Sequence, residues 1–235
     1  MKNKKEKLVV LDLETSGISI TTSRIVEMCM YFPGTEKIYS ILINPEISIP
    51  EGATGVHGIT NEMVKDCPTF KDLSIRLAKQ LKGVTVIGYN SKAYDVPLLQ
   101  NEFKRCNIEW EPVNQIDAYT IWTQQEKTKK LGDAYKRFCN KDLEGAHRAE
   151  NDVMATFKIF QVQESLWGYD TLVEATNKTP EPKKEKEITD TFAFGKYKGK
   201  TIKEVKELDL GYLQWLLKQD FTQPKLKTLI QKELK

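Results

Sequence analysis

Long apolar segments are absent from this sequence. None of its 235 residues falls in a run of about 18 apolar residues, the length that a transmembrane helix needs. The basic N-terminus, MKNKKEK, is followed by LVVLDL, which is too short for the apolar region of a signal peptide and contains an Asp. We therefore expect a cytoplasmic protein with no membrane partner.

Cysteine and histidine are also scarce. The four cysteines lie far apart, at Cys29, Cys67, Cys106 and Cys139. They form no CxxC pair and have no neighbouring His, so the ligand spacing of a zinc site is missing. A disulfide framework is typical of much smaller chains. We expect reduced thiols that are mostly buried.

The charges of the chain are unevenly distributed. Apolar residues make up 40% of the sequence and charged residues 29%, which is ordinary for a folded domain. The net charge is +3, but residues 178–235 hold 14 lysines and nine acidic residues, which leaves a balance of −2 for residues 1–177. A basic tail fits a polyanionic partner. A merely solvated lysine-rich surface fits the charge equally well.

A charged, proline-containing stretch, TNKTPEPKKEKE, separates the two parts. Residues 176–187 contain no large apolar side chain, which is typical of a linker. We therefore expect a larger domain over residues 1–175 and a small basic module over residues 188–235.

Periodicity predicts the elements of the larger domain. Strands are expected over residues 8–13, 24–32, 37–43, 84–87 and 115–116. Helices are expected over residues 70–81, 96–103, 131–139 and 149–166. Residues 44–59 are rich in Pro and Gly and are expected to form a long loop. This order predicts an α/β fold, a mixed sheet with helices on both faces.

Two carboxylates follow one another in the first predicted strand. Asp12 and Glu14 are at positions i and i+2 of LVVLDLETSG, so a strand would point both to the same face of the sheet. Two neighbouring anions beside a buried strand need a cation, and hard divalent cations prefer oxygen ligands. Two exposed acids at a fraying strand end are the alternative.

Two further acids and a histidine occur later in the chain. Asp95, in VIGYNSKAYDVPLL, follows a predicted strand and starts a helix, where an Asp is also a common cap. His147 and Asp152, in EGAHRAENDVMATFKIF, fit a loop His before a helical Asp. A His near neutral pH can serve as a general base. An ordinary surface His and a first-turn helix acid are the alternatives.

These five residues together predict phosphodiester chemistry. Four carboxylates balance two divalent cations, and two such ions stabilise the attacking and leaving oxygens of a phosphoryl displacement. His147 would then take the proton from the attacking water. We expect His57, in ATGVHGIT, to have a structural or substrate-positioning role.

The same segments resemble the motifs of a known family, the DEDDh 3′–5′ exonucleases typified by the epsilon subunit of bacterial DNA polymerase III. The matching segments are LVVLDLETSG, GYNSKAYDVPLL and GAHRAENDVMAT, joined by INPEISIPEGATGVHGITNEMVKDCPTF. The sister DEDDy group would have Tyr one residue closer to Asp152, where this chain has Arg148. Family members often have GHN and AFD in the second motif, whereas this chain has GYN and AYD.

The resemblance implies a fold and a site. It implies a ribonuclease H-like mixed five-stranded sheet and two Mg²⁺ or Mn²⁺ ions, bound by Asp12, Glu14, Asp95 and Asp152. His147 would be the general base, and Glu14 would also lie near the terminal 3′-hydroxyl. The residues expected to contact the 3′-terminal nucleotide are Thr15, Ser16, Gly17, His57 and Asn90.

The tail resembles the C-terminal module of exodeoxyribonuclease X-like proteins. A strand over residues 191–197 and helices over residues 202–208, 211–218 and 224–234 predict a small α+β module. FGKYKGK interleaves aromatic and basic residues, which suits nucleic-acid contact by Lys196, Tyr197, Lys198 and Lys200. As the alternative, these aromatics belong to a small core. For Phe192 and Trp215 we expect the core position.

The resulting hypothesis is a metal-dependent 3′–5′ exonuclease that releases 5′-mononucleotides, with DNA as the expected substrate and a DNA polymerase or repair complex as a candidate partner. An exoribonuclease of the same fold, acting on RNA 3′ ends or short oligonucleotides, would share the chemistry. A non-catalytic nucleic-acid-binding or polymerase-accessory protein would be expected to lack one of the carboxylates, and none is missing.

Overall fold

The chain divides into two compact units in a computed structural model. The units are Met1–Lys178 and Thr179–Lys235, here the N-terminal and the C-terminal unit. The structure describes residues 7–125, 130–145, 148–178, 192, 196–197, 199–218 and 224–234. Among these residues, no helix combines the length and the apolar character that crossing a membrane requires.

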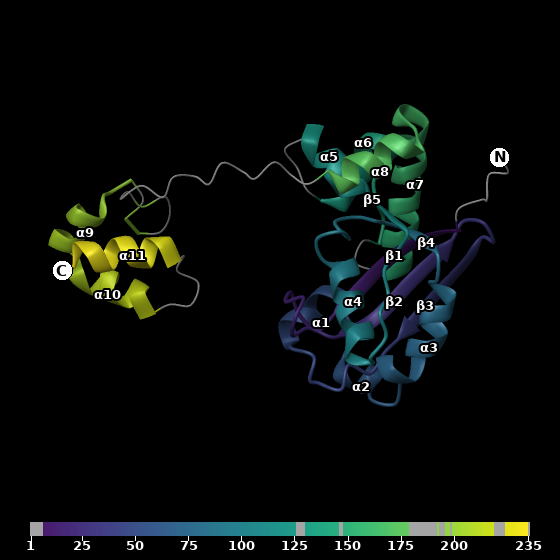
Figure 1. The fold of residues 1–235 in the computed structure, drawn as a ribbon, viewed down its shortest axis with the longest axis horizontal. Helices are drawn as coiled ribbons and strands as arrows, with labels where there is room; N and C mark the ends of the chain where they lie inside the picture. Colours follow the sequence, from purple (N-terminus) through teal and green to yellow (C-terminus); the bar gives the residue numbers. More distant parts are fainter. Residues whose placement is uncertain are drawn as a thin grey trace. The chain divides into compact units, whose positions relative to one another are not determined.

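A five-stranded mixed sheet forms the centre of the N-terminal unit (Figure 1). Its strands are β1 (Lys7–Thr15), β2 (Ile25–Phe32), β3 (Lys37–Leu42), β4 (Val84–Gly88) and β5 (Asn114–Asp117), in the order β3-β2-β1-β4-β5. The pairs β1–β2 and β2–β3 are antiparallel, whereas β1–β4 and β4–β5 are parallel. The predicted mixed α/β sheet is confirmed.

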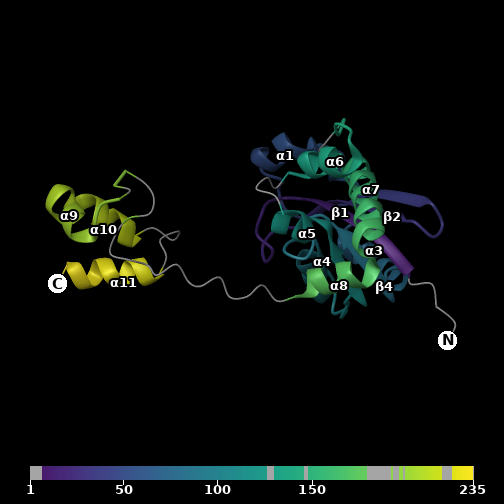
Figure 2. The same cartoon turned by 90° about the horizontal axis from the view of Figure 1, so that it is seen from above.

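Helices cover both faces of this sheet, as Figures 1 and 2 show from two directions. Successive residues of β1 alternate between the faces. Leu11 and Leu13 enter the core that includes α3 (Phe70–Gln80) and α4 (Asp95–Arg105). Val10 enters the core formed with α7 (Ala149–Trp167) and α8 (Tyr169–Asn177).

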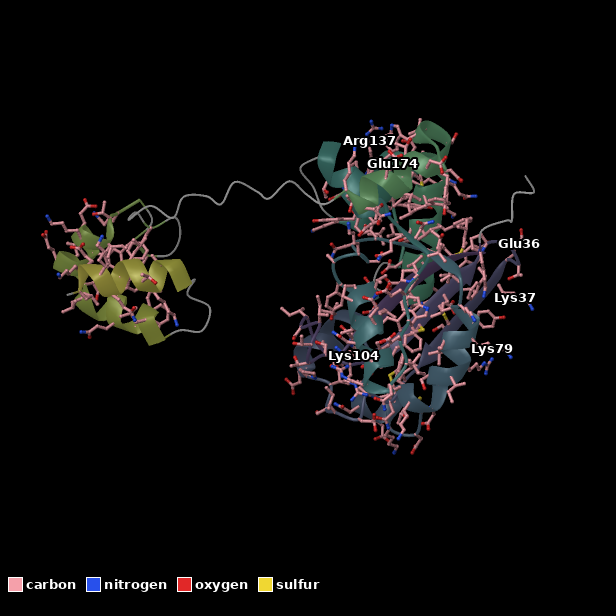
Figure 3. All side chains as sticks on the ribbon, viewed as in Figure 1. Glu36, Lys37, Lys79, Lys104, Arg137 and Glu174 are labelled. Atoms are coloured by element: carbon pink, nitrogen blue, oxygen red, sulfur yellow. The ribbon has the colours of Figure 1, made fainter. Side chains whose placement is uncertain are left out.

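Helix α3 shows how local sequence sets these elements. Its N-cap Thr69 accepts a hydrogen bond from the backbone of Asp72, whose side chain accepts one in return from the backbone of Thr69. Phe70 and Leu77 of α3 are buried in the core, while Lys79 of α3 extends outward, as does Lys104 of α4 (Figure 3). Such amphipathic faces made both helices predictable.

Some elements of the N-terminal unit were not predicted. Besides α8, which was not expected, the short helices are α1 (Glu51–His57), α2 (Asn61–Val64), α5 (Ala118–Gln125) and α6 (Leu131–Cys139), of which only α6 was expected. Helix α1 lies inside the segment expected to be a loop. It buries none of its residues, so no apolar periodicity marks it, and it ends at Gly58 with a φ of 76°.

Helix α8 corrects the expected start of the linker. Thr176 and Asn177 were assigned to the linker but belong to α8. Thr176 is 1% exposed, and its hydroxyl accepts a hydrogen bond of 2.8 Å from the backbone N–H of Asp117. These contacts fix the end of the helix to β5.

The C-terminal unit contains α9 (Ile202–Leu208), α10 (Leu210–Lys218) and α11 (Pro224–Glu233), which enclose a small apolar core. Phe192 is 2% exposed and belongs to that core, as expected. Trp215 was expected there too, but it is 47% exposed, because the inward positions of α10 are occupied by Leu213 and Leu216. Most of the strand expected over residues 191–197 lies outside the described residues.

Candidate metal centre and nucleic-acid interface

Three carboxylates from two elements meet at the end of β1. Asp12 and Glu14 point to the α7 face of the sheet, and Asp152 comes from the first turns of α7. Each contributes a carboxylate oxygen that lies within 4.8 Å of the others. The alternation of β1 and the packing of α7 on the same face of the sheet therefore produce the cluster.

Asp95 lies beside this cluster but is not one of the three. It is the first residue of α4 and is 7% exposed. Its Oδ1 accepts a hydrogen bond of 3.1 Å from the backbone N–H of Leu13, which lies between Asp12 and Glu14. Among the neighbouring charges, that of Asp95 contributes most to the raised pKa of Asp12.

The electrostatics of the cluster favour a cation. Burial raises the pKa of Asp12 well above its ordinary value, and repulsion from Asp95, Glu14 and Asp152 adds to the shift. Burial, followed by the charge of Asp152, raises the pKa of Glu14 to about 7. The ionised forms are thus costly on their own. A bound divalent cation would offset this cost, so the residues fit such an ion.

Sequence reasoning missed another acid next to this cluster. Glu27 of β2 is paired directly with Glu14 across the antiparallel strands. Its charge contributes to the raised pKa of both Asp12 and Glu14. Only the strand register, which the sequence does not state, brings Glu27 to this position.

The loop that follows β1 is held by hydroxyl groups. The Thr15 hydroxyl donates to the carbonyl of Gly17 at 2.7 Å and lies 2.8 Å from the Tyr94 hydroxyl, which also donates to that carbonyl. Ser16 is 5% exposed, and both its N–H and its hydroxyl bind the backbone of Arg24. Ser16 therefore shapes the loop. A Cβ at Gly17 would lie 3.1 Å from the Ser23 hydroxyl, so a larger residue there would require the Ser23 side chain to shift by a few tenths of an ångström.

His57 lies beside the end of β1. Its Nδ1 accepts a hydrogen bond of 3.0 Å from the backbone N–H of Ile59. Partial burial lowers its pKa, and the backbone of Thr15 opposes that shift. The structure thus brings His57 next to the loop that follows β1, where a positioning role is sterically reasonable.

Asp117 organises the loop that follows β4, and sequence reasoning missed it. Its carboxylate accepts backbone hydrogen bonds from Asn90 at 2.8 Å, Lys92 at 3.0 Å and Tyr119 at 3.0 Å. Asn90 is exposed and has a φ of 62°, a conformation that Asn tolerates. The position of Asp117 at the end of β5 was the available signal, since sites in such sheets form at strand ends.

His147 lies outside the described residues, although its neighbourhood is partly defined. The carbonyl of Gly145 accepts a hydrogen bond of 2.9 Å from the Asn151 side chain, one residue before Asp152. Gly145 has a φ of 66°, and a Cβ there would lie 2.5 Å from that side chain. Both ends of the short segment that carries His147 are therefore anchored near Asp152.

In the C-terminal unit, two of the residues expected to contact nucleic acid interact with other residues of that unit. The Lys196 ammonium lies 3.2 Å from Asp209 and 4.9 Å from the centre of the Tyr197 ring. The Tyr197 hydroxyl donates to Asp209 at 2.8 Å. Lys200 is exposed, and Lys198 lies outside the described residues.

Comparison with known families matches both units. The exonuclease family model matches residues 9–160, which include the strand and helix that carry the three clustered carboxylates. A second model, for the exodeoxyribonuclease X-like C-terminal region, matches residues 192–221.

One curated relative is the 3′–5′ exonuclease DinG of Staphylococcus haemolyticus (strain JCSC1435). It is 27% identical over 167 residues, which are 67% of this chain and 18% of that protein. The matched part of this chain thus spans less than a fifth of the length of that relative.

Solved structures show the same fold. Escherichia coli exonuclease I in complex with a dA16 oligonucleotide has a TM-score of 0.60 and 16% identity, over 68% of this chain and 41% of that one. Exonuclease X in complex with 5′ overhanging duplex DNA has a TM-score of 0.51 and 19% identity, over 72% of this chain and 99% of that one. The family model covers more than half of the sequence and agrees with the fold and with the motifs. The chain therefore belongs to the exonuclease family.

Proposed function

We propose that the N-terminal unit is a metal-dependent 3′–5′ exonuclease that hydrolyses phosphodiester bonds at 3′ ends and releases 5′-mononucleotides. The observation that carries this proposal is the meeting of Asp12, Glu14 and Asp152 within 4.8 Å in an exonuclease-family fold. Burial, together with the charges of the neighbouring carboxylates, raises the pKa of Asp12 and of Glu14, so their ionised forms are costly without positive charge beside them.

The metal ions in this proposal are two Mg²⁺ or Mn²⁺ ions, held by Asp12, Glu14, Asp95 and Asp152. Both cations prefer oxygen ligands, and four carboxylates match their total charge. When bound, such ions stabilise the charge that develops on the attacking and leaving oxygens of a phosphoryl displacement. Asp95 lies beside the other three through its hydrogen bond to Leu13.

The protein side chains supply the proton transfer and the orientation. His147 would accept the proton of the attacking water, and Glu14 would lie near the terminal 3′-hydroxyl. The hydrogen bond between Gly145 and Asn151 anchors the segment that leads to His147. This arrangement supports the assignment of His147 as the base.

The 3′-terminal nucleotide would be positioned by the loop after β1 and its neighbours. We propose the backbone of Thr15 and Gly17 as the closest contact, since Gly17 has no Cβ to keep a nucleotide at a distance. His57 lies beside Thr15, and Asn90 is exposed at the end of β4. Ser16 would act by shaping the loop through its bonds to Arg24.

We propose DNA as the substrate. The family-model match in the C-terminal unit is to an exodeoxyribonuclease region, and both structural neighbours above were solved with DNA. A polymerase or repair complex as a partner and a cytoplasmic location remain predictions from the sequence.

The test is a substrate panel with the purified full chain and Mg²⁺. A 5′-labelled single strand should shorten stepwise, a 3′-labelled strand should release labelled mononucleotide first, and EDTA should stop both reactions. Matched DNA and RNA strands then decide the sugar preference, and a rate on RNA equal to or above that on DNA would contradict the DNA assignment.

Two variants complete the test. Asp12→Ala should abolish the reaction, whereas Glu174→Gln, which alters an exposed acid on α8, should leave the rate unchanged. A normal rate for Asp12→Ala would overturn the metal assignment. Binding of nucleic acid without hydrolysis in Mg²⁺ or Mn²⁺ would overturn the proposed activity.

A further inference from the structure

Helix α10 carries an exposed tryptophan, Trp215. Trp215 is 47% exposed, although tryptophan is usually largely buried. Its ring stacks on that of Tyr212, with centroids 5.7 Å apart and planes inclined by 28°. An exposed indole supported by a second ring presents a flat apolar surface to solvent.

This surface belongs to a fixed row of aromatic rings. Tyr212 also contacts Tyr197 edge to face, with centroids 5.1 Å apart. Asp209 fixes both tyrosines, because it accepts a hydrogen bond of 2.8 Å from the Tyr197 hydroxyl and one of 3.0 Å from the backbone N–H of Tyr212. The position of Trp215 is therefore set by its helix and by the ring of Tyr212, which Tyr197 and Asp209 hold in turn, and this lowers the entropy cost of stacking a ligand on Trp215.

Positive charge accompanies the row. Lys196 lies over Tyr197 at the far end of the row, where it also pairs with Asp209 at 3.2 Å, and its side chain is 66% exposed. Lys200 and Lys203 are exposed in the same unit. Residues 178–235 hold 14 lysines and nine acidic residues. A flat aromatic surface among lysines fits bases joined by a phosphate backbone better than an uncharged or basic peptide.

We propose that Trp215 is the base-stacking platform of a single-stranded nucleic-acid site in the C-terminal unit. The proposal rests on the proposed action of the chain on nucleic acid and assigns this unit its own contact with the strand. Trp215 replaces Tyr197 as the stacking residue, because Tyr197 is half-buried and its hydroxyl binds Asp209. Stacking tolerates any base, as an enzyme that removes successive nucleotides requires.

Binding in EDTA tests this inference independently of catalysis. The probe is a 5′-fluorescein-labelled oligo(dT) 20-mer, and its anisotropy is followed as the full chain is added. Trp215→Ala should weaken binding about 5-fold to 100-fold, the range measured for the loss of one base-stacking side chain. Trp215→Phe should retain most of the affinity because it keeps a ring.

Two controls separate stacking from other roles. Leu210→Ala removes another exposed apolar side chain of α10, 44% exposed, and should leave binding unchanged. An abasic strand of the same length keeps the phosphates but lacks bases, so wild type and Trp215→Ala should bind it equally. Thermal melting of each variant checks that the C-terminal unit remains folded.

Three results would overturn the inference. They are unchanged oligo(dT) binding by Trp215→Ala, an equal loss in Trp215→Ala and Leu210→Ala, and an equal loss on the abasic strand. Cleavage of a three-nucleotide substrate by the wild type in Mg²⁺ is measured separately, and a wild type without cleavage would contradict the proposed activity alone.

Discussion

At the scale of single residues, one hydroxyl group ties the loop after β1 to the start of α4. Tyr94 immediately precedes Asp95, and its hydroxyl contacts Thr15 at 2.8 Å and the carbonyl of Gly17. Members of the family often have AFD at this position, whereas this chain has AYD. The structure gives the departure a role, because a phenylalanine could not make these contacts.

Replacing Tyr94 should therefore disturb substrate positioning more than metal binding. Tyr94→Phe removes two contacts worth ~0.5–1.5 kcal/mol each, so we expect kcat/KM on a short DNA strand to fall roughly 5-fold to 100-fold. The affinity for Mn²⁺, measured by calorimetry, should not change. Tyr39→Phe, on β3, is the matched control and should behave as wild type. Unchanged kinetics in Tyr94→Phe would show that the loop does not depend on the hydroxyl.

The carboxylates also make stability depend on pH when no cation is bound. The pKa of Glu14 rises from 4.5 to about 7, and that of Asp95 from 3.8 to about 7. The folded chain therefore binds these protons more tightly than the unfolded chain does. The stability that these two groups contribute is fully present below their pKa values in the unfolded chain, and it is lost as the pH rises through about 7.

Melting curves in EDTA should show this decrease. We expect Tm to fall between pH 5 and pH 8, and saturating Mn²⁺ should cancel the fall because the cation favours the ionised carboxylates. Asp12→Asn should raise Tm in EDTA at pH 8 and remove most of the Mn²⁺-induced shift. A flat EDTA profile in the wild type would contradict the charge repulsion that we infer.

At the scale of elements, Asp117 connects β5 to the loop that leads to α4. It accepts hydrogen bonds from the backbones of Asn90, Lys92 and Tyr119, and its own N–H binds Thr176 of α8. Burial raises its pKa, while the bonds from Lys92 and Asn90 oppose the rise. The loop geometry before Asp95 therefore depends on a carboxylate outside the metal cluster.

Loss of this acceptor should destabilise the sheet edge. Asp117→Asn replaces an ionised acceptor of several N–H groups, so we expect the free energy of unfolding to fall by ~1.5–3 kcal/mol, measured by urea titration. Asp142→Asn breaks only the exposed pair with Lys136 and should cost less than ~1 kcal/mol. Equal effects of the two substitutions would show that the Asp117 network adds little.

The elements also show what the sequence could and could not predict. The alternation of β1 placed Asp12 and Glu14 on one face, because a period of two is visible in the residues themselves. Helix α1 escaped prediction because it buries no residue. The contributions of Glu27, Tyr94 and Asp117 depend on strand register and on contacts between distant segments, so no local sequence pattern predicts them.

At the scale of the whole molecule, the two units differ in charge and, in our proposals, in the part of the reaction that each one serves. The acidic N-terminal unit carries the metal-binding cluster, and the basic C-terminal unit carries Trp215 and its lysines. A covalently joined second contact raises the effective concentration of a long strand without changing the chemistry. We expect a strand of a few nucleotides to use the N-terminal unit alone.

Removal of the C-terminal unit should therefore act on long substrates alone. The deletion should cover residues 179–235, because α8 extends through Asn177 and Thr176 supports Asp117. We expect weaker binding of a 20-mer, with a reduced dependence on salt, and unchanged cleavage of a three-nucleotide substrate. An equal loss of activity on both lengths would assign the unit a structural role instead.

The central claim is that the carboxylates gathered at β1 and α7 hold the ions that hydrolysis requires. Its most direct test is the rate of 3′-nucleotide release as Mn²⁺ is raised, for wild type, Asp152→Asn and Glu174→Gln side by side. We predict a saturable rate for wild type and Glu174→Gln, and a rate roughly 1000-fold lower for Asp152→Asn, because several kcal/mol of transition-state stabilisation depend on the ions. An Asp152→Asn rate within a few-fold of wild type would contradict the claim.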